Sequence, residues 1–462
     1  MKCPTSESLL TTIPALNELS KTFTSPPPKF TNQLFGTRQL SFLTTLESFF
    51  GFFMLEKLKV SEINVVNPCI KEPVRSWFNV SLMSVSHFMS DFYTAFLPVL
   101  LPILAARYDI SYTQSATIYM IFTVAMNFAQ PPIGILADRK NLNYLLPLSI
   151  LTGALFASAA TLSPNLWGII LIVLLCGICS SGFHPVSAAV LTKVIPENNK
   201  GLGTSIYIAG GNIGFAIAPL CVASFIESFG ENYLLAMAIP AIITTVLIYK
   251  QRLQNAQTVA ATPKDGPKFS TLITSKQFLV LNSAIALRSW TYCSFVVFLP
   301  MLFNAKGYDS ISGASCLVVM LLGCVAGGLV GGALTDKFGP KKVTLGSFVV
   351  SLIGSITFLN YCDTSFISLL ALFLCGAGAY GSTPNAIVWA QRLLPNSSAF
   401  AASMMLGFTF GAGYIESVLT GYLGDIIGLD KAMLYTACVA MAAAFFLLLP
   451  LKEPADTKNK TN

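Results

Sequence analysis

An acid and a base lie one helical turn apart in a strongly apolar stretch of the chain. His87 precedes Asp91 by four residues, so a helix places both side chains on one face. A carboxylate that is partly removed from water and lies beside an imidazole can bind and release protons near neutral pH. Glu416 is an acid in a second apolar stretch. We therefore expect Asp91 to be the main proton-responsive group, with His87 tuning it and Glu416 as the rival carrier.

A basic residue, Arg288, lies deep in another apolar stretch. Charged side chains are costly at the centre of a bilayer, so each one is a candidate functional residue. Arg288 suits an anionic substrate, and it can also pair with Asp91, either permanently or in competition with substrate. The other candidates for lining a substrate cavity, which helix packing explains equally well, are His184, Tyr292, Asn385 and Trp389.

We expect neither a metal site nor a cofactor. The chain has two histidines, His87 and His184, in separate apolar stretches, and the pair Cys176 and Cys179 has CxxC spacing without a second pair. We find no Gly-rich loop with a phosphate-binding Lys and no nucleophile–base pair. Secondary transport is therefore the first hypothesis, ahead of a membrane-embedded hydrolase or transferase and of a receptor.

The composition places these residues in a membrane. The 462 residues are 54% hydrophobic and 11% charged, with a mean hydropathy of +0.67, whereas soluble chains carry about 25% charged residues. The net charge of +7 comes from short loops between apolar runs, so no nucleic-acid partner is expected. Soluble enzymes, fibrous proteins and secreted modules are excluded, which leaves a polytopic membrane protein with the lipid bilayer as its surroundings.

Apolar runs long enough to cross a core of about 30 Å recur along the chain. They predict an all-α membrane protein with twelve transmembrane helices. We place the spans at 78–103, 114–136, 144–162, 166–190, 200–228, 232–249, 277–303, 311–334, 343–361, 365–391, 398–427 and 432–451. Lys and Arg concentrate on one side of this arrangement, and the other side keeps only Arg107, Lys306 and Lys431. The positive-inside rule then predicts that both termini are cytoplasmic.

Polar segments divide the chain further. We predict a largely disordered, cytoplasmic N-terminal extension at 1–77, a six-helix bundle at 78–250, a cytoplasmic linker at 251–275, a second six-helix bundle at 276–451 and a cytoplasmic tail at 452–462. Residues 1–53 have no run long enough for a span and no secretory signal. Translation that starts upstream of Met54 explains them, and a targeting segment is the alternative.

The two halves repeat one another. The segment Gly134–Lys140 follows the second span and Gly332–Lys337 follows the eighth, at an offset of 198 residues. Three further pairs follow at an offset of 199: Pro185 and Pro384, Pro196 and Pro395, and Gly214 and Gly413. Such repeats predict two pseudo-symmetric bundles that rock about a central site, with spans one, four, seven and ten lining the cavity.

The Gly-x-x-x-Asp-Arg/Lys pattern of these two loops resembles the signature loop of the major facilitator superfamily. The resemblance implies that the loops control which side of the protein is open. The implied gating residues are Gly134, Asp138, Arg139, Gly332, Asp336 and Lys337. The segment Asn212–Pro219 in span five resembles, more loosely, the antiporter motif of the same superfamily, through Gly214 and Pro219.

Other stretches resemble the fosmidomycin-resistance branch of the superfamily. These are His87–Asp91, Gly182–Pro185, Arg288–Trp290, Ala390–Pro395 and Gly407–Gly411. The resemblance implies proton-driven efflux of a small molecule or drug by a monomer in the cell membrane. Val186 stands where that family commonly has an acid. Uptake of a small anionic metabolite remains the alternative, because Arg288 suits an anion in either direction.

Overall fold

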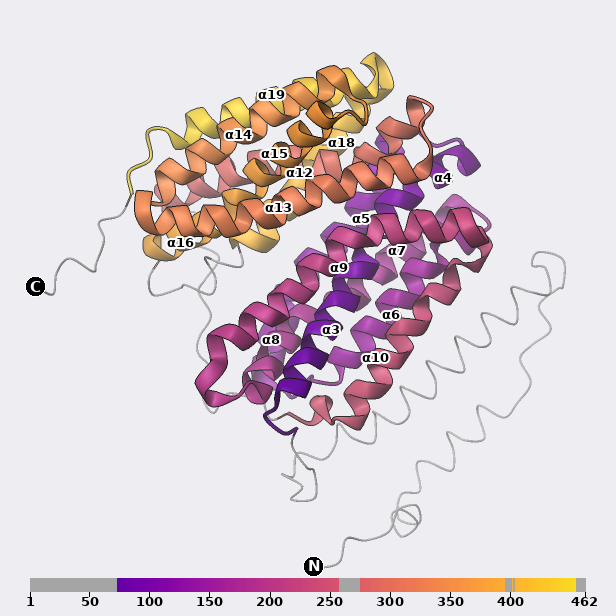
Figure 1. The fold of residues 1–462 in the computed structure, drawn as a ribbon, viewed down its shortest axis with the longest axis vertical. Helices are drawn as coiled ribbons and strands as arrows, with labels where there is room; N and C mark the ends of the chain where they lie inside the picture. Colours follow the sequence, from indigo (N-terminus) through magenta and orange to yellow (C-terminus); the bar gives the residue numbers. More distant parts are fainter. Residues whose placement is uncertain (1–72, 257–274, 395–400, 402–403, 454–462) are drawn as a thin grey trace, which may run out of the picture. The chain divides into compact units, whose positions relative to one another are not determined.

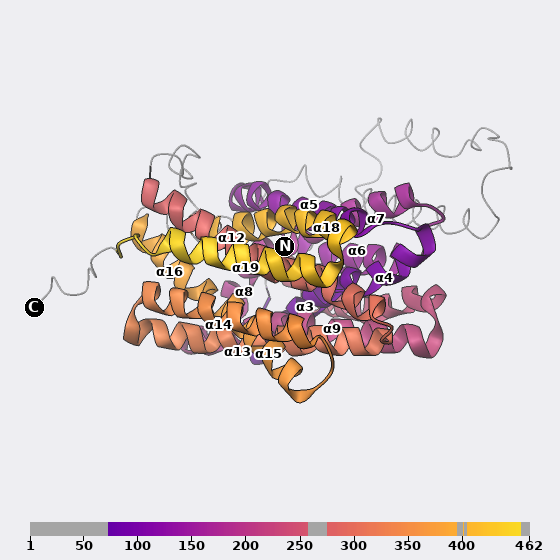
Figure 2. The ribbon, with the colours of Figure 1, turned by 90° about the horizontal axis from the view of Figure 1, so that it is seen from above.

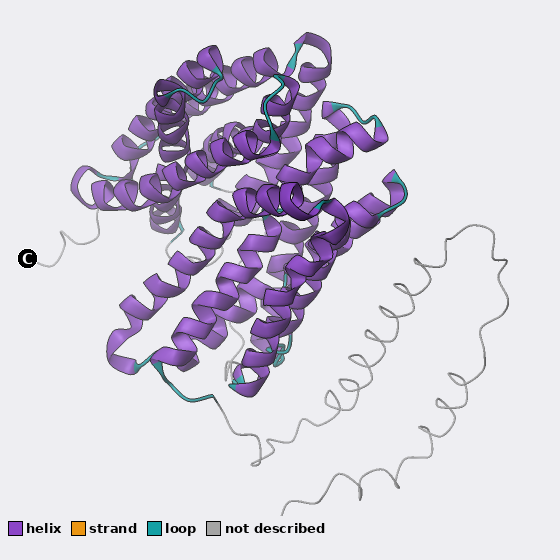
Figure 3. Ribbon diagram, turned by 45° about the vertical axis from the view of Figure 1, so that its right-hand side comes forward, coloured by secondary structure: helices purple, strands orange, loops and turns teal. Residues whose placement is uncertain are grey.

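The computed structural model describes residues 73–256, 275–394, 401 and 404–453. Most of the predicted N-terminal extension, linker and C-terminal tail lies outside these ranges, so their predicted character stays a prediction. The described residues form helices and no strands (Figure 3). The sequence thus folds into the predicted all-α architecture.

The described residues of the first half form eight α-helices and several short 3₁₀ turns (Figure 1). The α-helices are α3 (Trp77–Thr94), α4 (Leu97–Tyr108), α5 (Tyr112–Arg139), α6 (Leu145–Ala159), α7 (Leu166–Ser180), α8 (Phe183–Val194), α9 (Lys200–Phe229) and α10 (Ile239–Lys250). A 3₁₀ segment at Glu231–Ala238 leads into α10. Together these elements form the six predicted spans of this half.

The second half repeats the arrangement (Figure 2). Its helices are α12 (Lys276–Ala305), α13 (Ser310–Phe338), α14 (Pro340–Tyr361), α15 (Phe366–Gly381), α16 (Thr383–Leu393), α18 (Thr409–Ile427) and α19 (Leu429–Leu448). A π-turn at Met404–Phe408 precedes α18. Within the described residues, ten helical segments are long and apolar enough to cross a membrane. The predicted spans outside that set are α5 and the segment that ends in α18.

Three predicted spans are broken rather than continuous. Span one divides into α3 and α4, span four into α7 and α8, and span ten into α15 and α16. Each new helix has a proline in its first turn: Pro98, Pro185 and Pro384. Proline lacks a backbone N–H and collides with the preceding turn, so it fits best at a helix start. Pro102, Pro219 and Pro300 nevertheless lie inside α4, α9 and α12, as membrane helices can tolerate.

Large apolar side chains remain exposed on the outer helices. Leu329 is 73% exposed, Val439 62% and Phe446 68%. A water-soluble protein rarely leaves such side chains together on its surface, whereas a bilayer stabilises them. The inner helix α12, in contrast, is buried along most of its length.

Equivalent close contacts confirm the internal repeat. Gly177 of α7 lies so close to α5 that a Cβ atom would collide with the backbone oxygen of Phe122. Gly376 of α15 stands in the same relation to the backbone oxygen of Met320 in α13. These pairs are offset by 199 and 198 residues, as the sequence repeat requires. The two halves therefore use the same helix-packing scheme.

Hydrogen bonds join the two halves at the end opposite the basic loops. The backbone N–H groups of Tyr112 and Thr113, in the first turn of α5, donate to the Asp425 carboxylate of α18 at 2.8 and 3.0 Å. A carboxylate at a helix N-terminus is favoured by the helix dipole as well as by the hydrogen bonds. We call this contact the Asp425 latch. No pattern in the sequence predicted it.

We predict that Gly376→Ala lowers the thermal unfolding midpoint clearly. The added methyl group meets backbone atoms rather than a movable side chain, and overpacking of this kind costs about 1–3 kcal/mol. The matched control is Gly346→Ala in α14, because a Cβ there meets nothing within 4 Å. Equal unfolding midpoints for the two variants in detergent would contradict the packing scheme.

Candidate functional site

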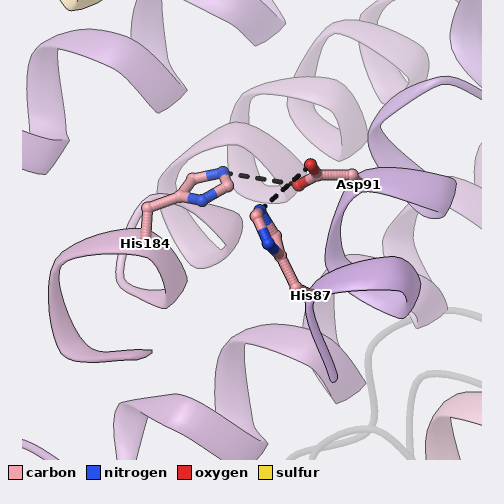
Figure 4. Close-up of side chains that lie close together, drawn as sticks. All are labelled: His87, Asp91 and His184. Atoms are coloured by element: carbon pink, nitrogen blue, oxygen red, sulfur yellow. Dashed lines mark ion pairs between the residues drawn. The ribbon is translucent and has the colours of Figure 1, made fainter. Parts of the chain in front are cut away.

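Both histidines of the chain converge on Asp91 (Figure 4). His87 Nε2 lies 3.2 Å from Asp91 Oδ2, and His184 Nε2 lies 3.5 Å from Asp91 Oδ1. Asp91 and His87 come from α3, whereas His184 comes from α8. We call these three residues the His–Asp–His cluster. Spans one and four therefore meet at one carboxylate. Both belong to the four spans that the sequence predicted to line the cavity.

A backbone carbonyl fixes the orientation of His87. Its Nδ1 lies 2.9 Å from the carbonyl oxygen of Tyr207 in α9, and the two rings stack with centroids 4.2 Å apart. A carbonyl oxygen only accepts hydrogen bonds, so Nδ1 carries the proton. The other nitrogen, Nε2, then faces the Asp91 carboxylate. Two acceptors that face each other at this distance repel unless a proton or another cation lies between them.

Glycines let α9 approach α3 closely enough for this contact. A Cβ on Gly211 would lie 2.5 Å from His87 Nε2 and 2.6 Å from Asp91 Oδ2. Gly210 and Gly214 abut the backbone of Ser84 and Phe88 in the same way. Small residues spaced four apart are a known signal of close packing between membrane helices. The sequence motifs singled out Gly214 alone, although its spacing of four from Gly210 could have revealed that second glycine.

His184 is held by the break between α7 and α8. It is the second residue of α8, directly before Pro185, and the Ser187 hydroxyl one turn later hydrogen-bonds to the Tyr207 hydroxyl at 2.6 Å. No sequence motif had pointed to Tyr207, which thus contacts both α3 and α8. The cluster is therefore supported from α9 on two sides.

The end of α8 is tied to the segment before α3. Arg75 donates to the Ile195 carbonyl at 2.8 Å and pairs with Glu197 at 2.9 Å. Lys200 and Arg75 hold the pKa of the exposed Glu197 carboxyl below its usual range. These contacts connect the start of α3 with the end of α8, and these two helices supply the cluster.

Arg288 lies fully buried in α12, and no carboxylate pairs with it among the residues that the structure describes. Its Nη2 donates to the Thr383 hydroxyl at 3.2 Å, and its guanidinium lies 5.4 Å from the centre of the Phe410 ring. Nε and Nη1 have no hydrogen-bond partner among the described residues. A buried charge without a counter-charge is strongly unfavourable. The unpaired guanidinium therefore makes Arg288 a candidate anion-binding residue.

Arg288 and Asp91 do not form the ion pair that the sequence allowed. The only basic groups paired with Asp91 among the described residues are the two histidines. Tyr380 of α15, which no sequence motif singled out, interacts electrostatically with both Arg288 and Asp91.

The remaining cavity candidates are buried. The Tyr292 ring lies 5.4 Å from that of Phe410 and 6.0 Å from that of Tyr380, which places it beside Arg288. Asn385 accepts from Thr335 and donates to the Gly381 carbonyl at 2.9 Å, so it ties α16 to α13. Trp389 is fully buried, and its indole N–H has no partner in the described structure.

Glu416 lies apart from these groups. It is partly buried in α18, and one carboxylate oxygen has no hydrogen-bond partner among the residues that the structure describes. No described basic residue pairs with it, which agrees with the sequence, where no basic neighbour was apparent. It stays the rival proton carrier.

The two signature loops occupy equivalent positions. A Cβ on Gly134 would lie 3.6 Å from Pro185, and a Cβ on Gly332 would lie 4.0 Å from Pro384. Each loop glycine therefore faces the proline that starts the second part of span four or span ten. The exposed Lys337 extends over the Phe338 ring, with its Nζ 5.3 Å from the centre. The side chains of Asp138, Arg139 and Asp336 lie outside the described structure, so the gating assignment stays a prediction.

Comparison with known proteins identifies the family. The model of the Major Facilitator Superfamily matches residues 83–405 and 314–462. The chain belongs to the major facilitator superfamily. This confirms the predicted fold and the resemblance carried by the signature loops.

The alignments with relatives and with solved structures cover most of this chain. The fosmidomycin resistance protein of Escherichia coli strain K12 is 22% identical over 80% of this chain and 91% of its own length. The gentisate transporter of Corynebacterium glutamicum is also 22% identical, over 77% of this chain and 84% of its own. The crystal structure of the nucleoside transporter NupG matches with a TM-score of 0.63 at 16% identity, over 82% of this chain and 100% of its own. The structural likeness shows the fold alone.

We predict that Arg288→Met leaves the unfolding midpoint of the ligand-free protein at or above that of the parent chain. Desolvating an unpaired charge costs several kcal/mol, which outweighs about 1.5–3 kcal/mol for one charged hydrogen bond. Arg288→Lys, which keeps the charge, is the control and should not be stabilised. A clear drop for Arg288→Met in detergent would show that Arg288 stabilises the fold rather than a ligand.

Proposed function

We propose that this major facilitator is a proton-coupled secondary transporter that exports a small organic anion, such as the phosphonate fosmidomycin, by alternating access. The observation that carries the proposal is the buried Arg288, with two unpartnered nitrogen atoms and aromatic rings around it. An anion that binds there neutralises the guanidinium and is itself neutralised. We assign no enzymatic reaction to the chain.

The proton-binding part of the proposal rests on the His–Asp–His cluster. Among the described residues, the titratable groups that interact with Asp91 are His87, His184 and, at longer range, Tyr207 and Tyr380. A proton between His87 Nε2 and the carboxylate turns two repelling acceptors into a charge-assisted hydrogen bond. Gaining and losing this proton changes the charge of the cluster by one.

Two further features support export from a cell. The relative that confers fosmidomycin resistance matches nearly the whole membrane region, and resistance by transport means export. The basic loops favour cytoplasmic termini in the cell membrane. We propose that the protein works as a monomer and that Gly134, Asp138, Arg139, Gly332, Asp336 and Lys337 control opening on the basic side.

Uptake of an aromatic acid is the second candidate. The rings of Phe410, Tyr292 and Tyr380 lie beside Arg288, so a planar carboxylate has both a cation and aromatic faces to bind. A gentisate transporter is among the relatives. This function uses the same two sites, Arg288 and the His–Asp–His cluster. Protons would then move in the same direction as the substrate, whereas in proton-driven export they move in the opposite direction.

The sign of the proton movement tests both functions in one experiment. Fosmidomycin or gentisate is added outside proteoliposomes that contain a pH-sensitive dye. Inward movement of substrate raises the internal pH in an antiporter, because protons leave, and lowers it in a symporter. This result does not depend on how the protein is oriented in the liposome. If neither compound changes the internal pH but one of them enters, proton coupling is wrong.

We predict that Asp91→Asn abolishes proton-driven accumulation and leaves substrate exchange without a pH gradient largely intact. The amide cannot ionise, so the cluster no longer gains and loses a proton. Glu416→Gln is the matched control and should retain accumulation. If Asp91→Asn still concentrates substrate at the parental level while Glu416→Gln does not, the carrier is Glu416.

We further predict that Asp425→Ala opens the end of the protein that the Asp425 latch closes. The variant loses a contact between the two halves. The matched control is Asp309→Ala, which removes a similar helix cap within one half, where the Ser312 N–H donates to the Asp309 carboxylate at 2.7 Å. Spin labels at Trp167 and Phe366, exposed at the starts of α7 and α15, report the separation at this end. A longer distance in Asp425→Ala but not in Asp309→Ala is expected, and unchanged distances would refute a latch.

A further inference from the structure

The His–Asp–His cluster brings together three groups that ligate transition metals. The sequence predicted no metal site, because the two histidines lie in separate spans. The structure removes that reason, since His87, His184 and Asp91 each offer one ligand atom and these three atoms lie within 4.8 Å of one another. Among the described residues this is the only group of three His, Cys, Asp or Glu side chains placed in this way.

The separations of these atoms fit a small tetrahedral ion. Ligands at 2.0–2.1 Å from Zn²⁺ are about 3.3 Å from each other in a tetrahedron. His87 Nε2 lies 3.2 Å from Asp91 Oδ2, and His184 Nε2 lies 3.5 Å from Oδ1, the other oxygen of the same carboxylate. Both imidazoles point at this carboxylate (Figure 4), and the ligand atoms of the three residues lie within 4.8 Å of one another. The cluster is therefore close to the required geometry before any ion binds.

The surroundings of His87 meet a second requirement. Histidines that bind metals usually donate their other ring N–H to a carbonyl or carboxylate, which fixes the tautomer and the ring orientation. His87 does so through Nδ1 and the Tyr207 carbonyl at 2.9 Å, and it stacks on the Tyr207 ring. Nε2 is thereby left with its lone pair directed at the cluster. This observation is independent of the distances between the three ligands.

We infer that His87, Asp91 and His184 form a binding site for a divalent transition-metal ion of the Zn²⁺ class. Two imidazoles and a carboxylate suit Zn²⁺ and Co²⁺, whereas Mg²⁺ and Ca²⁺ prefer all-oxygen ligands. The three side chains keep 12%, 18% and 33% of their surface exposed, so an ion can enter and keep a fourth ligand from solvent. The site goes beyond the proposed transport function and does not depend on it.

The test uses Co²⁺ with the purified full chain in detergent, prepared with a tag that contains no histidine. We expect about one Co²⁺ per chain with the visible absorption of a tetrahedral site, displaced by Zn²⁺ and not by Mg²⁺. Asp91→Asn, His87→Gln and His184→Gln should each weaken binding by at least about tenfold. Asp91→Glu, which keeps a carboxylate, should retain most of the signal.

Controls separate this site from incidental binding. Cys221→Ser removes an exposed thiol and should leave the Co²⁺ spectrum unchanged. The thermal unfolding midpoint of each variant shows whether it is folded, and Zn²⁺ should raise that midpoint for the parent chain but not for His184→Gln. Absence of Co²⁺ binding by the folded parent chain overturns the inference, as does binding that survives in the folded His87→Gln and His184→Gln variants.

Discussion

The close approach of α9 to α3 determines where chemistry can occur in this protein. Gly210, Gly211 and Gly214 have no side chains, so the backbone of α9 lies against α3. The carbonyl groups of Ile206 and Tyr207 are then within reach of Ser84 and His87, which donate to them at 2.7 and 2.9 Å. This one packing contact therefore fixes the His87 tautomer and directs Nε2 at Asp91. It also leaves no room for a larger residue at position 211, because such a side chain would displace the cluster.

The internal repeat places different chemistry at equivalent positions of the two halves. Gly214 abuts Phe88, and Gly413 abuts Ser289, so α18 packs on α12 as α9 packs on α3. His87, the residue before Phe88, then corresponds to Arg288, the residue before Ser289. The first half supplies its charged residue with partners on α8 and α9, whereas the second half leaves the Arg288 guanidinium with one hydroxyl. The same scaffold thus carries the His–Asp–His cluster, which we propose binds a cation, and the buried Arg288, which we propose binds an anion.

The sequence predicted the elements better than their mutual orientation. Apolar runs and repeat offsets identify the spans, because length and hydropathy depend only on position along the chain. The convergence of His184 on Asp91 depends on how α8 is rotated about its axis after the break at Gly182, and hydropathy carries no record of that rotation. The Asp425 latch was missed for a similar reason, since it joins residues more than three hundred positions apart. The glycine spacing in α9 was the one unused signal.

The two charged sites also constrain how binding of substrate and binding of proton are linked. Tyr380 interacts electrostatically with Arg288 and with Asp91, although the two charges do not pair directly in the described structure. In the transporter that we propose, any electrostatic coupling between an anion at Arg288 and a proton at Asp91 is positive, because the anion cancels a positive charge that favours the ionised carboxylate. Reinforcement yields co-transport, whereas exchange requires that the two ligands exclude one another. A substrate whose hydroxyl donates to the Asp91 carboxylate, while its anionic end binds Arg288, competes with the proton for the same lone pair. The reach of the substrate from Arg288 to Asp91 thus decides the direction in which the proton gradient drives it.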